Sequence, residues 1–372
     1  DYNLNIPRYI DSQEPEDIQD IEAHLLGGIP NADIDALADY WEVYPGLRKA
    51  LFGKTDRPKY SRLKIEKDQI KHTIFHHPDF IQFSEKMDAV FNGWKKRTAK
   101  KLKDLAPGFK PKELIYEISE SLLAAYSDIH LIDKYDAYQH LLNYWVDVMQ
   151  DDCYLLTTDG WKAEVTRIIV QNKKGGQVDK GWTCELIPPA IVIDRYFAKE
   201  KSMITQLEAE RDALVARQEE LEEENSGEDG YFAEMEKVNK ASAQKRLKEI
   251  KSDKEAKDEA KILHAYVKLC DDQSDLNAKI KTAAEDLDKI TLKRYSELND
   301  AEIKKLVVDD KWMTSIDKLI KGEMDRMSQR LAQRIKELAE RYETPLPVQT
   351  KEVADLEKKV SVHLEKMGFI WS

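Results

Sequence analysis

Residues 262–290, ILHAYVKLCDDQSDLNAKIKTAAEDLDKI, place seam positions at alternating steps of four and three residues. These positions are Ile262, Tyr266, Leu269, Gln273, Leu276, Ile280, Ala283, Leu287 and Ile290. Such spacing keeps one stripe of a helix facing a partner helix, as in a coiled coil, and the polar Gln273 would help to fix the register. A helix of roughly 40 residues reaches about 60 Å at 1.5 Å per residue. The stretch therefore predicts a projecting helical arm.

A shorter seam precedes this one. Leu207, Leu214 and Leu221 recur every seven residues in a charged stretch that begins near Ile193. The run Asn225–Gly230 breaks the pattern, and a basic helix is expected over residues 243–250. Two seams on either side of a break predict a long antiparallel coiled-coil hairpin over residues 193–296. Heptads alone fit pairing within one chain and pairing between two chains.

Amphipathic patterns also fill residues 34–150. Asp33 is expected to cap a helix that ends at Pro45-Gly46, and Pro78 to start another helix. Apolar side chains at three- and four-residue spacing mark the buried faces. They are Phe80, Phe83, Met87, Val90, Phe91 and Trp94, then Ile115, Ile118, Leu122 and Leu123, then Leu141, Leu142, Trp145, Val146 and Met149. A compact helical domain over residues 34–150 is predicted, after an acidic connector within residues 1–33.

The pattern changes over residues 151–192. Residues 161–170 are rich in β-branched side chains, a Gly-rich turn follows at 172–176, and residues 181–187 form the next apolar stretch. This predicts a small β-hairpin that ends at Pro188-Pro189. Residues 297–372 are predicted to be C-terminal helices, the last of which carries Val353, Leu356, Val360, Leu364 and Met367. The predicted fold class is mainly α.

The composition suits a helix-rich protein, with 35% charged and 41% hydrophobic residues. A formal charge of -12 argues against a general polyanion binder, although local basic faces remain possible. Cys153, Cys184 and Cys270 lie far apart and are interpreted as reduced, partly buried thiols rather than a disulfide framework or a zinc site. No apolar run approaches the roughly 20 residues that cross a bilayer. We expect a cytoplasmic protein without a membrane partner.

No catalytic, cofactor-binding or metal-binding constellation stands out. Pro188-Pro189 lacks the flanking amide and aromatic ring of an adenine-methyltransferase loop, and no Gly-rich cofactor loop or P-loop is present. His76-His77 has no metal-ligand spacing, so one packed and one exposed histidine are expected. Asp151-Asp152 and Asp309-Asp310 are interpreted as solvated or capping carboxylates rather than a cation site.

One basic cluster contrasts with the acidic background. It comprises Lys95, Lys96, Arg97, Lys100, Lys101 and Lys103. Contact with the phosphates of DNA is one interpretation, since lysine and arginine supply nonspecific backbone binding. A solvated helix face, or pairing with the acidic connector, is the other.

The opening residues, Asp1-Tyr2-Asn3-Leu4-Asn5-Ile6-Pro7-Arg8-Tyr9, resemble the Asn-x-Asn-Ile-Pro-Arg-Tyr segment of the modification (M) subunit of type I restriction–modification systems. Further segments along essentially the whole chain resemble the C-terminal half of long M subunits. They are Trp41, Pro45-Gly46-Leu47-Arg48, Leu51-Phe52, the block 306–312 and the block 337–347. In that family the opening segment follows the adenine-N6 methyltransferase core. The catalytic residues are therefore expected before residue 1, and the chain, which opens on Asp, is expected to be a C-terminal fragment.

The resemblance implies an assembly region that is inactive alone. The parent protein would be a site-specific adenine DNA methyltransferase that uses S-adenosylmethionine, whereas this fragment would hold no cofactor. The partners implied are the specificity (S) subunit, a second M subunit, the restriction (R) subunit and DNA in the full complex. Asn3, Asn5, Arg8 and Tyr9 would lie near DNA or the S subunit. A stand-alone coiled-coil scaffold without any methyltransferase link is the alternative.

Overall fold

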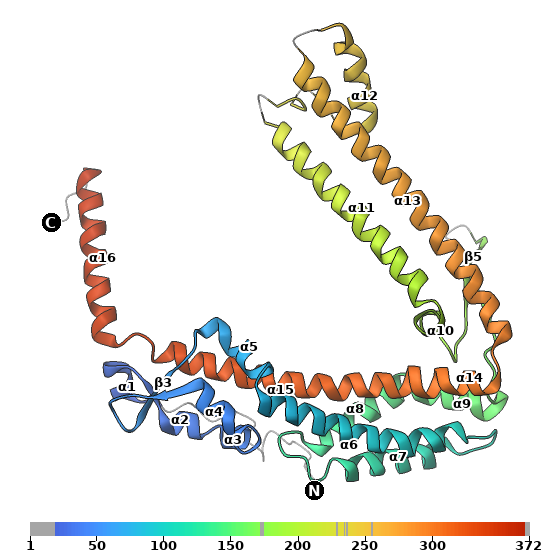
Figure 1. Cartoon of the computed structure of the whole chain (residues 1–372), viewed down its shortest axis with the longest axis horizontal. Coiled ribbons are helices and arrows are strands. Elements are labelled where there is room, and N and C mark those ends of the chain that lie inside the picture. Colours follow the sequence, from blue (N-terminus) through green and yellow to red (C-terminus); the bar gives the residue numbers. More distant parts are fainter. Residues whose placement is uncertain are drawn as a thin grey trace. The chain divides into compact units, whose positions relative to one another are not determined.

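A computed structural model describes residues 19–171, 175–227, 230–233, 235, 237–253 and 256–368. The chain forms two compact units. The first comprises residues 1–98, 112–147 and 316–372, and the second comprises residues 99–111 and 148–315. The fold is mainly α, with a helical domain, a small β-hairpin, a long antiparallel helical hairpin and C-terminal helices, so the predicted fold class is confirmed (Figure 1).

The first unit begins with short elements. They are α1 (Ile21–Leu26), β1 (Ile29–Pro30), α2 (Asn31–Asp35), α3 (Ala38–Val43), α4 (Pro45–Leu51), β2 (Phe52–Lys54), β3 (Tyr60–Leu63), the 3-10 helix η2 (Lys67–Gln69) and α5 (Ile70–Phe75). The three strands form an antiparallel sheet in the order β1-β3-β2. The prediction of a helical domain over residues 34–150 did not include β2 and β3, because strands of three and four residues are too short to show an alternating pattern.

Two helix boundaries also differ from the prediction. Asp33 lies inside α2, and Pro30 occupies the position before its first residue. Pro45 ends α3 as expected but also begins α4. Proline suits the first position of a helix, where its missing N–H leaves no hydrogen bond unmade.

Longer helices form the rest of the first unit. They are α6 (Pro78–Lys103, up to Thr98), α7 (Pro111–Ala125), α8 (Lys134–Tyr144), α15 (Thr314–Arg341, from Ile316) and α16 (Leu346–Lys366). Phe80, Phe83, Met87, Phe91 and Trp94 are buried along α6, as the spacing predicted. The indole N–H of Trp94 donates to the Ser121 hydroxyl at 2.9 Å.

A π-helical segment, Trp145–Met149, follows α8 and changes which side chains are buried there. Trp145 and Met149 are buried, but Val146 is 67% exposed, so its assignment to the buried face was wrong. A π-helix adds a residue to the turn and shifts the side chains that follow.

The second unit contains the hairpin and the long arm. Its elements are α9 (Gln150–Asp159), β4 (Thr166–Gln171), β5 (Gln177–Thr183), α10 (Pro189–Tyr196), α11 (Ala198–Asn225), α12 (Lys240–Glu249), the 3-10 helix η4 (Ile250–Ser252), α13 (Lys257–Glu297), α14 (Asp300–Lys304) and a π-helical segment (Lys305–Met313). The hairpin β4–β5 is confirmed, but Pro189 starts α10 rather than ending a strand, since β5 already ends at Thr183.

Helices α11 and α13 pack against each other in antiparallel directions within the one chain (Figure 1). Tyr266 and Leu287 are buried in the seam, whereas the other predicted seam residues, apart from Ile290, are half-buried. These half-buried residues are Leu207, Leu214, Leu221, Ile262, Leu269, Gln273, Leu276, Ile280 and Ala283. The two predicted seams therefore pair with each other within one chain.

The predicted seam fails at its last position. Ile290 is 38% exposed, and Thr291 and Tyr295 are buried instead. Near its end α13 packs on β5 and on the loop after it. The rings of Trp182 and Tyr295 lie 5.2 Å apart, and the Tyr295 hydroxyl donates to the Ile187 carbonyl. A straight helix drifts relative to a seven-residue repeat, so a different line of side chains faces these neighbours.

A buried ion pair anchors the base of the second unit. The Lys311 ammonium donates to Asp152 Oδ1 at 2.7 Å and to the Leu186 carbonyl at 2.8 Å. The Trp312 indole N–H donates to Asp152 Oδ2 at 2.7 Å. Burial raises the pKa of Asp152, and the Lys311 charge opposes that rise. The interpretation of Asp152 as a solvated carboxylate was wrong.

The neighbouring acidic pair is also engaged. Asp309 accepts from Lys103 at 2.6 Å, and Asp310 forms a two-pronged ion pair with Arg195. The π-helical segment thus directs three successive charged side chains, Asp309, Asp310 and Lys311, to three different parts of the second unit. Neither aspartate is the solvated or capping group that was predicted.

Replacing Asp152 with Asn tests this ion pair. The Lys311 charge would stay buried without its carboxylate, so we expect the variant to lose about 3 kcal/mol of unfolding free energy. Urea titration followed by circular dichroism measures the loss.

The exposed neighbour offers the control, since Asp151→Asn should unfold as the wild type does. The double variant Asp152→Leu, Lys311→Met should recover most of the loss, because no unpaired charge remains. An Asp152→Asn protein as stable as the wild type would show that the pair anchors nothing.

Candidate docking surfaces

Helix α16 keeps its apolar side chains in water. No side chain of α16 is buried, whereas α15 directly before it buries ten residues. Leu356 is 57% exposed and Met367 is 71% exposed. The large exposed apolar residues from the start of α16 to the turn after it are Leu346, Val348, Val353, Leu356, Val360, Val362 and Met367. Short helices owe most of their stability to packing of an apolar face, so a helix of this kind lacks its packing partner.

Helix α1 adds apolar residues next to the start of α16. Ile21 is 76% exposed, and Leu25 and Leu26 are exposed as well. Contacts join α1 to α16, and the Tyr342 hydroxyl at the end of α15 accepts from the Asp20 backbone N–H at 3.3 Å. We define the C-terminal apolar surface as Ile21, Leu25, Leu26, Leu346, Val353, Leu356, Val360 and Met367. Large exposed apolar residues on neighbouring helices are candidates for a site where another molecule binds.

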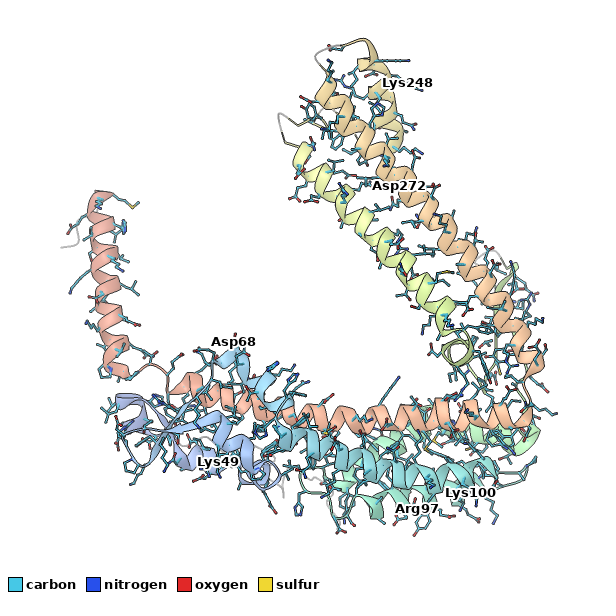
Figure 2. The ribbon with its side chains drawn as sticks, in the orientation of Figure 1. Lys49, Asp68, Arg97, Lys100, Lys248 and Asp272 are labelled. Atoms are coloured by element: carbon cyan, nitrogen blue, oxygen red, sulfur yellow. The ribbon has the colours of Figure 1, made fainter. Side chains whose placement is uncertain are left out.

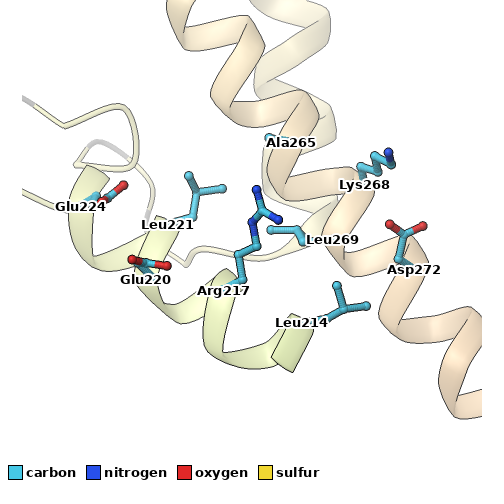
Figure 3. A pocket seen from close by; sticks show the side chains of 9 residues that line it. All are labelled: Leu214, Arg217, Glu220, Leu221, Glu224, Ala265, Lys268, Leu269 and Asp272. Atoms are coloured by element: carbon cyan, nitrogen blue, oxygen red, sulfur yellow. The ribbon is translucent and has the colours of Figure 1, made fainter. Parts of the chain in front are cut away.

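The arm offers a second, more polar surface. A groove of about 440 Å³ lies between α11 and α13 (Figure 3). The apolar part of its lining is Leu214, Leu221 and Leu269. The charged part is Arg217 and Lys268 together with the acidic residues Glu220, Glu224 and Asp272. The half-buried seam residues of the arm thus line an open groove. Compared with the C-terminal apolar surface, the groove exposes less apolar side chain and more charge.

The basic cluster lies at the end of α6. Lys96, Arg97, Lys100 and Lys101 are exposed, and Figure 2 shows Arg97 and Lys100 directed away from the helix. Lys95 is half-buried. Lys103 is bound to Asp309, so its assignment as a DNA contact is replaced by a structural role in the second unit. Basic side chains in a last helical turn also interact favourably with the helix dipole.

The remaining candidate residues have simpler surroundings. Asn3, Asn5, Arg8 and Tyr9 lie outside the described residues. His76 is exposed and stacks on His72, while His77 is partly buried beside Asp79. Across the described residues, no group of three or more His, Cys, Asp or Glu side chains is placed to hold a metal ion.

The cysteine thiols are free. Cys153 and Cys184 are buried and Cys270 is partly buried, as expected. Burial raises the pKa of the Cys153 thiol to about 12, which keeps it protonated and unreactive at neutral pH.

Comparison with protein-family models, with curated proteins and with solved structures gave no match to this chain. Within the part of the chain that the structure describes, no helix is both long and apolar enough to cross a membrane.

Charge reversal of Lys96, Arg97 and Lys100 tests the basic cluster. If these side chains contact phosphates in an assembled complex with DNA, their loss should reduce the slope of log affinity against log salt by about three. Fluorescence anisotropy with labelled duplex DNA over a salt series measures the slope.

A matched charge change uses three exposed lysines of the second unit, Lys199, Lys245 and Lys248, and should leave the slope in place. An unchanged slope in the α6 variant would remove the cluster from the set of DNA contacts.

Proposed function

We propose that this chain is the C-terminal assembly region of the M subunit of a type I restriction–modification DNA methyltransferase. The C-terminal apolar surface docks on the S subunit, and methyl transfer from S-adenosylmethionine to adenine N6 takes place elsewhere in the parent protein. The resemblance of the opening residues and of the block 337–347 supports the family. The exposed faces of α1 and α16 support the assembly role.

The observation that carries the proposal is that α16 buries none of its side chains. A helix with an apolar stripe packs into a groove or beside another apolar helix, which anchors it through side chains at i, i+3, i+4 and i+7. Val353, Leu356 and Val360 follow that spacing and are exposed together. In the family that the chain resembles, the S subunit is built around long helices, and a long helix has the shape that such a stripe accepts.

The arm favours the second candidate function, a stand-alone coiled-coil scaffold. Helices α11 and α13 pair with each other inside the chain, so the arm has a partner helix without another subunit. A scaffold would hold partners through the same apolar surface but would show no preference for an S subunit. DNA contact through the basic cluster belongs to the first candidate alone.

Co-purification with the cognate S subunit tests the proposal. We expect Leu356→Asp to reduce recovery of the S subunit by at least about tenfold, since a buried charge replaces an apolar anchor at the contact. Leu356 is exposed in this chain, so the substitution should leave the melting temperature unchanged.

Two further variants locate the contact. Val362→Asp lies on the opposite side of α16 and should recover the S subunit as the wild type does. Reversing Arg217 and Lys268 at the arm groove should also leave recovery unchanged. Loss of recovery in the groove variant, with normal recovery of Leu356→Asp, would move the docking site to the arm. Wild-type protein that recovers no S subunit would favour the scaffold.

A further inference from the structure

We propose that α16 pairs in antiparallel orientation with α16 of a second copy of this chain. This inference rests on the proposed function, in that it treats the C-terminal apolar surface as an assembly surface. Leu346, Val353, Val360 and Met367 are spaced seven residues apart, and Leu356 lies between two of them. All five are exposed. The four residues seven apart occupy the a positions of a heptad. Its d positions are Gln349, Leu356 and His363, so Leu356 is the apolar member of the d line.

The charges of α16 suit a copy of itself. Lys351, Lys358, Lys359 and Lys366 are balanced by Glu352, Asp355, Glu357 and Glu365, so four positive charges meet four negative ones. Two copies of a neutral helix pair without net repulsion, although the whole chain carries -12. A membrane surface is a poorer occupant, because helices that lie on anionic lipid have a polar face rich in Lys and Arg.

The positions of Glu352 and Lys359 set the direction of the pair. They lie seven residues apart and flank the same side of the stripe, the position called g in a heptad whose a positions are Val353 and Val360. In antiparallel pairs g faces g, so Glu352 of each copy lies beside Lys359 of the other. In parallel pairs g faces e, which would place Glu352 beside Glu357 of the second copy. Like charges at these flanking positions are unfavourable.

Both side chains are available for such contacts. Glu352 and Lys359 are exposed, and no ion pair found among the described residues uses either of them. The antiparallel pair has twofold symmetry, so both contacts form at once and the assembly closes at two copies. Val353 of each copy then packs against Leu356 of the other, and the apolar residues of α1 lie outside this seam.

The short seam limits the affinity. Helix α16 has 21 residues, about 31 Å at 1.5 Å per residue, which gives three heptads. Helices of this length are marginal alone, so pairing and helix formation are coupled. We therefore expect a reversible dimer with a micromolar dissociation constant.

Sedimentation equilibrium of the intact chain alone, without the S subunit, measures this dimer over about 1 to 100 µM, the range that brackets micromolar affinity. The wild type should fit a monomer–dimer equilibrium. Glu352→Lys should weaken the dimer several-fold, because two attractive contacts become Lys–Lys pairs, and Lys359→Glu should do the same. The double variant Glu352→Lys, Lys359→Glu should restore wild-type association.

Leu356→Asp should leave a monomer, whereas Val362→Asp, on the other side of the helix, should still dimerise. A monomeric wild type would overturn the inference. Tighter association of Glu352→Lys would overturn it as well, since that result identifies a parallel pair. Because no S subunit is present, failure here leaves the proposed docking to the S subunit standing, and failure of that docking leaves the dimer standing.

Discussion

Exposing an apolar helix stripe to water is unfavourable in free energy. The long helices of this chain differ in whether another helix of the same chain covers their apolar stripe. Helix α13 turns its stripe toward α11 within the same molecule and buries Tyr266 and Leu287. Helix α15 buries ten residues, all of them in the first unit. Helix α16 has a stripe of similar spacing and buries none of it. This contrast is what supports the proposed assembly role.

The base of the arm depends on a different constraint. A lysine ammonium taken out of water needs close acceptors, and Lys311 has Asp152 and the Leu186 carbonyl. These groups come from three separated segments, so the ion pair fixes how the segments meet. The adjacent Asp309 and Asp310 add contacts to Lys103 and Arg195.

Long periodic helices were predictable from the sequence, because many residues repeat the same signal. The arm over residues 193–296 and the helix after Pro78 were predicted on that basis. The three-stranded sheet was missed, since each strand is only two to four residues long. The pairing of Asp152 with Lys311 was missed because 159 residues separate them, and local sequence patterns do not predict contacts over that separation.

The candidate surfaces were predictable only in part. The amphipathic pattern of α16 identified Val353, Leu356 and Val360 as one face, but only the structure shows that nothing in the described chain covers that face. For the arm, the sequence identified the seam but not the partner helix, because heptads fit pairing inside one chain and pairing between two chains. The structure shows α11 and α13 of one chain packed together. The basic cluster was recognised as a set, yet Lys103 had to be removed from it because its partner lies 206 residues away.

Hydrogen–deuterium exchange of this chain with and without its S subunit, at a concentration well below that at which two copies pair, tests the central claim most directly. The account predicts slowed exchange of the α16 and α1 amides on binding, with little change along α11 and α13. Protection confined to the arm, or an α16 that exchanges equally fast in both states, would contradict it.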